Sequence, residues 1–355
     1  MARYKDWTRG DEQCFTSEVG FGPRGDYYHY VMVKGGKIVG FGDEQGNYAG
    51  GIYASPTFNT ECFKHEKERL KTQYPELYEK IKDIPLAKTY KPADKAIYQP
   101  KGKAGEYAAW ACNFYTGCSN DCQYCYCKRG VMSHVWDTKP HLKKCFRNEE
   151  HALRTFVDEA TKNLAELQQH GIFFSFTTDP MLPETIGLTQ AAVAACISLD
   201  IPVQILTKRA DWDLVVTYPE PEKAKELLAF GFTLTGCDDL EPYASLNIDR
   251  VKKMIQLHKE GYKVFASIEP IIKIDASYAM INALSGWCDL LKVGLLSGKK
   301  EYDKDGVQFL YDMMKDDTRG SKFYLKESFV DFLGLNRATL PPHFVDSTYN
   351  IFRGE

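Results

Sequence analysis

Residues 117–127 read GCSNDCQYCYC, and they directly follow a short apolar run at 111–116. Within this segment Cys118, Cys122 and Cys125 are separated by three and then by two residues, so one loop can surround a single metal site. Thiolate ligands select zinc, copper(I) or iron–sulfur clusters. Structural zinc sites commonly use four ligands in paired motifs. The spacing therefore favours an iron–sulfur cluster on three cysteines, and a zinc site that adds Cys127 is the alternative.

The composition indicates a globular protein that is not built on disulfides. The chain has 355 residues, of which 44% are hydrophobic, and its net charge is −3. Its eleven cysteines include five between positions 112 and 127, and the N-terminal residues lack the apolar core of a secretion signal. No run of about eighteen apolar residues predicts a membrane span. We expect a cytoplasmic protein that does not bind nucleic acid mainly through its net charge.

From residue 106 onward, short apolar runs alternate with amphipathic stretches of helical period. The pattern predicts strands at 111–116, 172–177, 202–207, 232–236, 263–268, 290–296 and 322–325, with helices at 149–170, 189–199, 221–230, 248–260, 277–285 and 306–316. Repeated βα alternation gives a parallel sheet with helices outside it. We predict an α/β fold with a partial (βα)6-type TIM-like barrel, whose chemistry belongs at the carboxyl ends of the strands.

The sequence predicts three parts. Residues 1–105 form an N-terminal extension of unknown role, with strands at 28–33 and 37–41 around a Gly-Gly turn and a helix at 61–84. Residues 106–327 form the core with the cysteine segment. Residues 328–355 form a C-terminal tail that packs on this core.

Two further segments complete a resemblance. Residues 174–184 read FSFTTDPMLPE, and the following predicted strand ends in Leu-Thr-Lys at 206–208. Together with the Cys-x3-Cys-x2-Cys spacing, they resemble the radical S-adenosylmethionine (SAM) superfamily and, within it, the spore photoproduct lyase-like branch. The resemblance implies a [4Fe–4S] cluster on Cys118, Cys122 and Cys125, SAM as the second cofactor, and an external electron donor of the flavodoxin or ferredoxin kind.

The resemblance also implies a cofactor-binding set, which comprises Tyr124, Thr178, Asp179, Lys208, Thr235 and Glu269. Thr178 and Asp179 would meet the methionine end of SAM, and Lys208 would pair with its carboxylate. Thr235 would face the ribose. Glu269 would point into the barrel mouth, or it would belong to a structural ion pair.

One position departs from this branch. The branch carries a hydrogen-donating cysteine where this chain has Phe176, and Cys127 or Cys237 could replace it. The resemblance thus implies an enzyme that reductively cleaves SAM to a 5′-deoxyadenosyl radical, which abstracts hydrogen from an unidentified substrate; nucleic acid is one candidate. A DNA photoproduct lyase and a zinc-stabilised binding protein without enzymatic activity are the alternatives.

Overall fold

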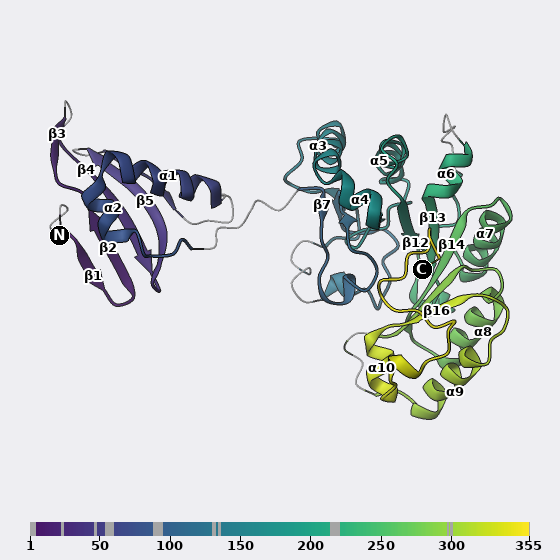
Figure 1. Ribbon diagram of the computed structural model, residues 1–355. Helices are drawn as coiled ribbons and strands as arrows, with labels where there is room; N and C mark the ends of the chain where they lie inside the picture. The colour runs from purple at the N-terminus through teal and green to yellow at the C-terminus, as the bar shows by residue number, and fades with distance from the viewer. Residues whose placement is uncertain are drawn as a thin grey trace. The chain divides into compact units, whose positions relative to one another are not determined.

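The computed structural model describes residues 5–22, 25–45, 48–53, 60–87, 95–129, 133, 136–213, 221–296, 298 and 301–354. The contacts divide the chain into two compact units, Met1–Ala93 and Asp94–Glu355 (Figure 1). Each unit is described by itself.

The first unit is built on an antiparallel sheet with the strand order β1-β2-β4-β5-β6, and β3 pairs with β4. The strands are β1 Trp7–Arg9, β2 Glu12–Thr16, β3 Gly20–Gly22, β4 Gly25–Lys34, β5 Lys37–Gln45 and β6 Tyr48–Tyr53. The predicted hairpin is confirmed, because Lys34 pairs with Lys37 across Gly35 and Gly36. Both glycines have positive φ, at 55° and 69°, as this tight turn requires.

Two helices accompany this sheet instead of the single one predicted over 61–84. They are α1 Thr60–Gln73 and α2 Pro75–Ile81. The break follows from Pro75, which lacks an N–H group and begins the second helix. Apolar residues of both helices pack with the sheet in one core, which consists of Val31, Val33, Ile38, Phe41, Phe63, Leu70, Leu77 and Ile81.

The second unit contains the predicted parallel sheet. Its strand order is β16-β15-β14-β13-β12-β11-β8-β7, and all neighbours are parallel except the pair β7–β8. The strands are β7 Ile97–Tyr98, β8 Ala111–Cys112, β11 Ile172–Phe174, β12 Val203–Thr207, β13 Leu228–Thr233, β14 Lys263–Ile271, β15 Leu290–Leu295 and β16 Lys322–Leu325. The path from β16 to β7 is open in this order, so closure into a partial barrel stays a prediction.

Helices follow these strands along the chain. They are α3 Glu149–Lys162, α4 Leu164–His170, α5 Ile186–Ser198, α6 Pro221–Leu227, α7 Asn247–Lys259, α8 Ile274–Leu284, α9 Lys304–Lys315 and α10 Glu327–Leu333. Among the described residues, none of the helices combines the length and the apolar composition needed to cross a membrane. The predicted helix at 149–170 is interrupted at Asn163, which ends α3 and precedes α4.

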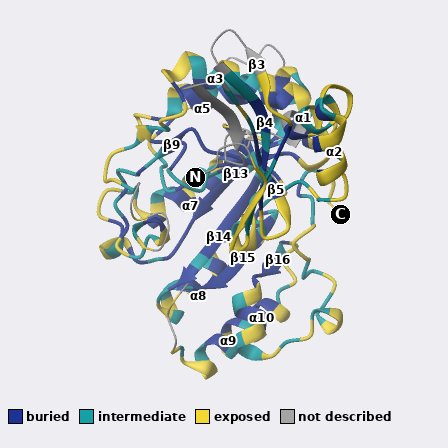
Figure 2. Ribbon diagram, turned by 90° about the vertical axis from the view of Figure 1, so that its left-hand side faces the viewer, coloured by how far each residue is buried: buried dark blue, intermediate teal, exposed yellow. Residues whose placement is uncertain are grey.

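The two faces of this sheet are covered differently. One face packs against α3, α5, α7, α8 and α9 in the largest apolar cluster of the protein. The other face carries Phe173, Phe265 and Tyr324, which pack with Tyr107 and with Ile351 from the C-terminal segment. As a result, the central strands β13 and β14 are buried (Figure 2).

Several strand boundaries differ from the predicted ones: β11 ends at Phe174 rather than at 177, and β14 extends to Ile271 rather than to 268. β13 begins at Leu228 rather than at 232, and all six of its residues are buried. Its Gly231 faces the Phe265 ring so closely that a Cβ would lie 2.2 Å from it, so this strand needs a glycine there. The predicted strand 111–116 is divided, because Tyr115–Thr116 (β9) leaves the sheet and pairs with His141–Leu142 (β10).

The boundary between the units lies at residue 93/94, twelve positions before the predicted one at 105. The segment after the boundary is held by the second unit through Glu159 of α3. This carboxylate accepts the backbone N–H groups of Lys95, Ala96 and Ile97 at 2.5, 2.9 and 2.9 Å. Ile97 then begins β7, which pairs with β8. These residues therefore belong to the core and not to the extension.

Candidate functional site: the cysteine loop and its neighbours

The cysteine loop, residues 117–127, follows β9. Its conformation is fixed by backbone contacts within the loop and with the segment at residues 137–139. Gly117 has φ 92°, and a Cβ on it would lie 2.3 Å from the carbonyl oxygen of Lys139, so only glycine fits. The N–H of Cys118 donates to Asp137 O at 3.0 Å, and that of Cys125 donates to Cys122 O at 3.2 Å. These bonds fix the backbone that carries the three thiols.

The three predicted ligand thiols are free and differ in their acidity. Burial raises the pKa of Cys118 to about 12 and also raises the pKa of Cys122. A hydrogen bond from the Cys127 thiol is the main cause that lowers the pKa of Cys125 to about 6; burial opposes it, while Lys208 and Lys128 assist it. The thiolate is the form that binds metals, so Cys125 is already prepared for ligation at neutral pH.

Asp179, after β11, is a hydrogen-bonded hub rather than a free carboxylate. One oxygen accepts from Thr207 Oγ1 at 2.6 Å and from Met181 N at 3.0 Å. The other accepts from Asn120 Nδ2 and from Lys208 N, both at 2.7 Å. The side chain is 6% exposed. Asp179 thus ties the cysteine loop to the ends of β11 and β12, and both of its oxygens are occupied.

Lys208 follows β12 and lies beside the thiols. Its ammonium group lies 5.5 Å from the centre of the Tyr124 ring. Burial lowers the pKa of Lys208, but the charges of Cys122 and Glu241 outweigh it, so the pKa is raised overall. Within the described residues this ammonium group makes no hydrogen bond. It is therefore a cation held near the cysteine loop and available to an anionic ligand.

Tyr124 is fixed in place by a buried ion pair. Its hydroxyl donates to Glu241, which accepts from Arg250 of α7 at 2.5 Å, and both side chains of this pair have no exposed surface. Arg250 also donates to Thr233 O at 2.6 Å, at the end of β13. The loop after β13 and the start of α7 therefore hold the aromatic residue of the cysteine loop.

Two buried oxygen atoms near Asp179 lack a partner within the described chain. They are Asn120 Oδ1 and Thr178 Oγ1. Asn120 is 1% exposed, and its Nδ2 donates to Asp179. Because a carboxylate only accepts, this bond fixes the amide orientation and leaves Oδ1 as a free acceptor. Buried polar atoms without partners are rare, so these two mark a place where a ligand atom is expected.

The two candidate hydrogen donors lie in different surroundings. The Cys127 thiol is buried, with its sulfur 3.5 Å from the carbonyl oxygen of Phe176, and the Tyr126 hydroxyl donates to the same oxygen. Cys237 lies in the turn after β13, where its N–H donates to Thr235 Oγ1 at 3.2 Å. Of these two cysteines, Cys127 is the one for which the described residues show a contact with Phe176.

The remaining predicted residues are engaged in internal contacts. Thr235 is fully buried and accepts from Cys237. Glu269 accepts hydrogen bonds from Tyr107 Oη at 2.6 Å and from Lys326 Nζ at 2.8 Å. With Lys326 it forms a structural ion pair, which was the alternative expectation for this residue. Beside them Lys292 donates to Tyr107 O at 2.9 Å, and burial is the main cause that lowers its pKa to about 7.

The cysteine thiols of the loop fit an iron–sulfur cluster better than a single metal ion. Within the described ranges, no three His, Cys, Asp or Glu side chains are gathered around one point as a single ion requires. A tetrahedral zinc site needs such an arrangement. An iron–sulfur cluster distributes its thiolates over separate irons. Three free thiols on one loop, one of them acidic, have the chemistry of that ligand set.

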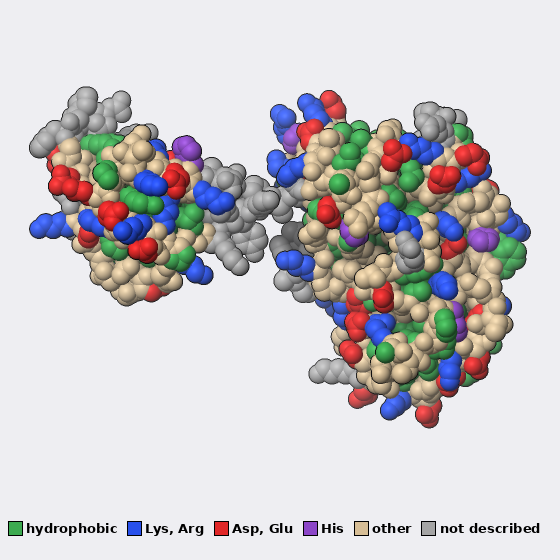
Figure 3. Space-filling model, viewed as in Figure 1, with side chains coloured by type: hydrophobic (Ala, Val, Ile, Leu, Met, Phe, Trp, Pro, Cys, Tyr) green, Lys and Arg blue, Asp and Glu red, His purple; other side chains and the backbone are tan. Residues whose placement is uncertain are grey.

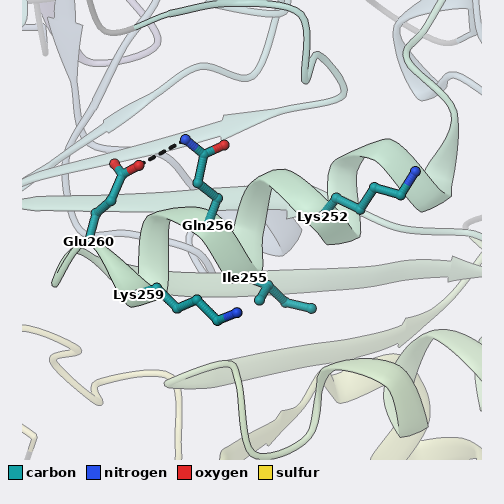
Figure 4. Close-up of a pocket in the computed structure, with 5 residues that line it drawn as sticks. All are labelled: Lys252, Ile255, Gln256, Lys259 and Glu260. Atoms are coloured by element: carbon teal, nitrogen blue, oxygen red, sulfur yellow. Dashed lines mark hydrogen bonds between the residues drawn. The ribbon is translucent and has the colours of Figure 1, made fainter.

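Neither of two surface hollows is lined by residues of this loop. One of about 440 Å³ lies on α7 and is lined by Lys252, Ile255, Gln256, Lys259 and Glu260 (Figure 4). These residues lie toward the carboxyl end of α7, where the chain enters β14, whereas the cysteine loop contacts the segment before α7. The other, of about 300 Å³, belongs to the first unit and includes His29 and Arg69. Acidic and basic side chains are interspersed on the face of the second unit seen in Figure 3.

Comparisons with known proteins give distant likenesses. No family model matches the chain, and no curated protein matches it. Nine chains of solved structures match. SuiB of Streptococcus suis bound to S-adenosylmethionine is 13% identical, with a TM-score of 0.41, over 62% of this chain and 52% of that one. SuiB bound to the precursor peptide SuiA is 11% identical over 95% of this chain and 77% of that one, with the same score.

A mandelate racemase/muconate lactonizing protein from Geobacillus sp. Y412MC10 is 11% identical, with a TM-score of 0.33, over 96% of this chain and 83% of that one. A further structure of SuiB is matched over 62% of this chain and over half of its own length. These scores are too low to establish a shared fold. The function is therefore inferred from this chain's own residues.

Sequence reasoning missed several residues of the site. Glu241, Arg250 and Asn247, whose Nδ2 donates to Glu241 at 3.3 Å, belong to no motif. A charged residue on the apolar side of α7 next to Val251 is nevertheless a signal of a buried pair. Asn120 lies inside the cysteine segment, but nothing in the spacing distinguishes it from its neighbours. Only the contact with Asp179 reveals it.

Proposed function

We propose that this protein is a radical SAM enzyme that holds one [4Fe–4S] cluster on Cys118, Cys122 and Cys125 and binds SAM beside it. The observation that supports this most is the grouping of three free thiols on one loop, with Lys208 as a cation next to them. When bound, the two cofactors supply a one-electron cleavage of SAM to a 5′-deoxyadenosyl radical, which abstracts hydrogen from the substrate. A flavodoxin- or ferredoxin-like protein would deliver the electron.

The chain's own residues provide binding and orientation. Lys208 would take the carboxylate of SAM, as a desolvated cation favours an anion. Asp179 would hold the cysteine loop and the end of β12 in register through its four hydrogen bonds. The Glu241–Arg250 pair would hold Tyr124. The sheet with a mouth at its carboxyl edge would form the predicted partial barrel.

Anaerobic reconstitution tests the proposal. The full chain should bind about four irons, develop the brown absorbance of an iron–sulfur protein, and release 5′-deoxyadenosine from SAM when dithionite is added. One zinc per chain without a visible chromophore would instead support the zinc-stabilised binding protein. A chain that takes up iron but never cleaves SAM would contradict the enzymatic proposal.

One observation favours the DNA photoproduct lyase as a second candidate. The Cys127 thiol contacts the backbone of Phe176, the position at which the related lyases carry their hydrogen donor. In this candidate the S–H bond of Cys127 breaks, and its hydrogen atom forms the new C–H bond of the repaired base, leaving a thiyl radical. The reaction should repair a photoproduct-containing oligonucleotide, and Cys127→Ala should stop repair while SAM cleavage continues. Cys237→Ala is the matched control and should leave repair unchanged; equal loss in both variants would contradict this role.

A further inference from the structure

The first unit contains a cavity of about 300 Å³ between its sheet and helix α1. Two of its lining residues, Phe41 and Leu70, also belong to the apolar core of this unit. The polar side chains that line it are those of Tyr27, His29 and Asp43 from β4 and β5, and of Glu66 and Arg69 from α1. Polar groups beside an apolar core cost free energy unless they find partners, and a cavity of this size admits a small ligand.

The positive charge at this cavity is already paired. Arg69 donates from Nε and Nη2 to one oxygen of Glu66, at 2.9 and 2.8 Å. Its third nitrogen, Nη1, donates to Gln73 Oε1 at 2.8 Å. All three guanidinium nitrogens therefore have partners, and Arg69 is not free to bind an anionic ligand.

His29 does not add a positive charge to the cavity. Its side chain is 3% exposed, and burial is the main cause that lowers the pKa of the imidazole; Arg69 acts in the same direction and Asp43 opposes both. The ring is therefore neutral at neutral pH. Its Nε2 shares a hydrogen bond with the Tyr27 hydroxyl. The centre of the ring lies 4.9 Å from that of Tyr27 and 4.0 Å from that of Tyr74.

The negative charge of Asp43 is not paired in this way. Asp43 lies directly across the antiparallel ladder from His29, so both side chains project from the same face of the sheet. Its carboxylate makes no hydrogen bond and no ion pair with the described residues. The described lining thus combines one uncompensated negative charge with an ion pair, Glu66–Arg69, whose charges cancel.

The class of ligand follows from this charge and from the rings beside it. The faces of aromatic rings attract cations, and a carboxylate supplies the counter-charge. A single metal ion is disfavoured, because no three His, Cys, Asp or Glu side chains of the described chain are gathered around one point. An alkylammonium or guanidinium group on an apolar stem matches the carboxylate, the rings, and the apolar side chains of Phe41 and Leu70.

We propose that the cavity of the first unit binds an organic cation, with Asp43 as its counter-ion and the ring of Tyr27 in contact with it. The site gives the first unit a binding role that does not depend on the cysteine loop of the second unit. The cation is a free amine or the basic side chain of a polypeptide, since both present the same chemical group.

A ligand-observed NMR titration of the full chain with n-butylammonium tests the charge preference. This cation should bind, and butan-1-ol, which has a similar shape without the charge, should bind at least tenfold more weakly. Butyrate, which carries the opposite charge, should not bind. No binding of n-butylammonium, equal affinities for the amine and the alcohol, or a preference for butyrate would overturn the proposal.

Asp43→Asn removes the counter-charge and keeps the size of the side chain. The affinity for n-butylammonium should fall roughly tenfold. The thermal midpoint should stay the same, because Asp43 has no hydrogen bond to lose within the described residues. Asp11→Asn is the matched control, since Asp11 is an exposed carboxylate of the same unit outside the cavity lining. Equal weakening in both variants would reduce the effect to net charge and contradict the site.

Tyr27→Leu and Tyr27→Phe separate the ring from its hydroxyl. Both variants lose the hydrogen bond to His29, but only the leucine variant loses the aromatic face. Tyr27→Leu should therefore bind n-butylammonium roughly threefold more weakly than Tyr27→Phe. The same affinity in both variants would overturn the contact assigned to this ring.

Two peptides distinguish the sources of the cation. N-acetyl-Gly-Lys-Gly-amide carries an alkylammonium group on a backbone, and its norleucine analogue lacks the charge. Tighter binding of the lysine peptide than of n-butylammonium would support a polypeptide partner, and weaker binding would support a free amine. A norleucine peptide that binds as tightly as the lysine peptide would contradict the proposal for either source.

Discussion

The two halves of the sheet's carboxyl edge treat polar groups in opposite ways. After β8 to β13, three thiols are free, the Lys208 ammonium lacks a hydrogen bond in the described chain, and two buried oxygens lack partners. Toward the carboxyl end of β14 and directly after β16, Ser267, Glu269 and Lys326 are hydrogen-bonded into one group with Tyr107, which comes from the segment before β8. We call these halves the open side and the closed side. Charged residues occur on both sides, so charge alone does not mark a site. Polar groups without a partner in the described chain distinguish the open side.

The largest effect should come from the thiols of the open side. Cys122→Ala removes one of three ligands, and iron bound after anaerobic reconstitution should fall from about four per chain to near zero. Cys145→Ala is the matched control, since Cys145 is exposed and outside the loop. Iron analysis and the visible spectrum give the result. Full iron content in Cys122→Ala would show that the open side is not a cluster site.

The next effect tests whether a satisfied pair is structural. Arg250→Met leaves Glu241 as an unpaired charge without exposed surface, so the free energy of unfolding of the second unit should fall by about 3–5 kcal/mol. Urea unfolding of the cluster-free protein measures it. Arg154→Met breaks an exposed pair with Glu150 and should change the value by less than about 1 kcal/mol. Equal changes in both variants would contradict the importance of burial here.

A smaller effect contrasts the lysines of the two sides. Lys208→Met removes a cation without a described hydrogen bond, so stability should fall less than in Lys326→Met, while the affinity for SAM falls roughly tenfold to a hundredfold. Lys326→Met breaks the pair with Glu269 and should lower stability instead. Denaturation and equilibrium dialysis on both variants test the contrast. If Lys326→Met weakened SAM binding and Lys208→Met caused the larger loss of stability, the assignment of the two sides would be wrong.

The smallest effect concerns acidity within the loop. Because a hydrogen bond from Cys127 is the main cause that lowers the pKa of Cys125 to about 6, Cys127→Ala should raise it toward the ordinary thiol value. A thiol reacts as its thiolate, so the pH of half-maximal alkylation of Cys125 in cluster-free protein should move upward.

The contribution of the lowered Cys125 pKa to the free energy of unfolding has a defined sign. A lowered thiol pKa stabilises the fold fully above the ordinary pKa, and this contribution is lost as the pH falls through about 6. Cys127→Ser keeps a donor and should retain most of the shift. Mass spectrometry of the peptide that contains Cys125 follows the alkylation. Identical pH profiles for wild type and Cys127→Ala would exclude the hydrogen bond as the cause.

The order of strands and helices could be predicted from the sequence because it depends on local periodicity. The boundaries of some strands could not be predicted, because long-range packing determines them. β13 starts at Leu228 because its neighbours β12 and β14 pair with it there. The three proposed ligand cysteines and Lys208 are predicted by motif. Asp179 was also found, but its motif could not show that Asn120 and Thr207 already occupy its oxygens, since these partners lie 59 and 28 positions away.

The cover on the second face of the sheet has a consequence for the order of assembly. Val345, Tyr349, Ile351 and Phe352 pack with Phe173 and Phe265, and they are synthesised after every strand they cover. During translation, the cysteine loop emerges while that face is still bare, and domains tend to fold as units. The second face of the sheet therefore stays uncovered while the thiols are synthesised, and it is closed only after residues 345–352 have been added.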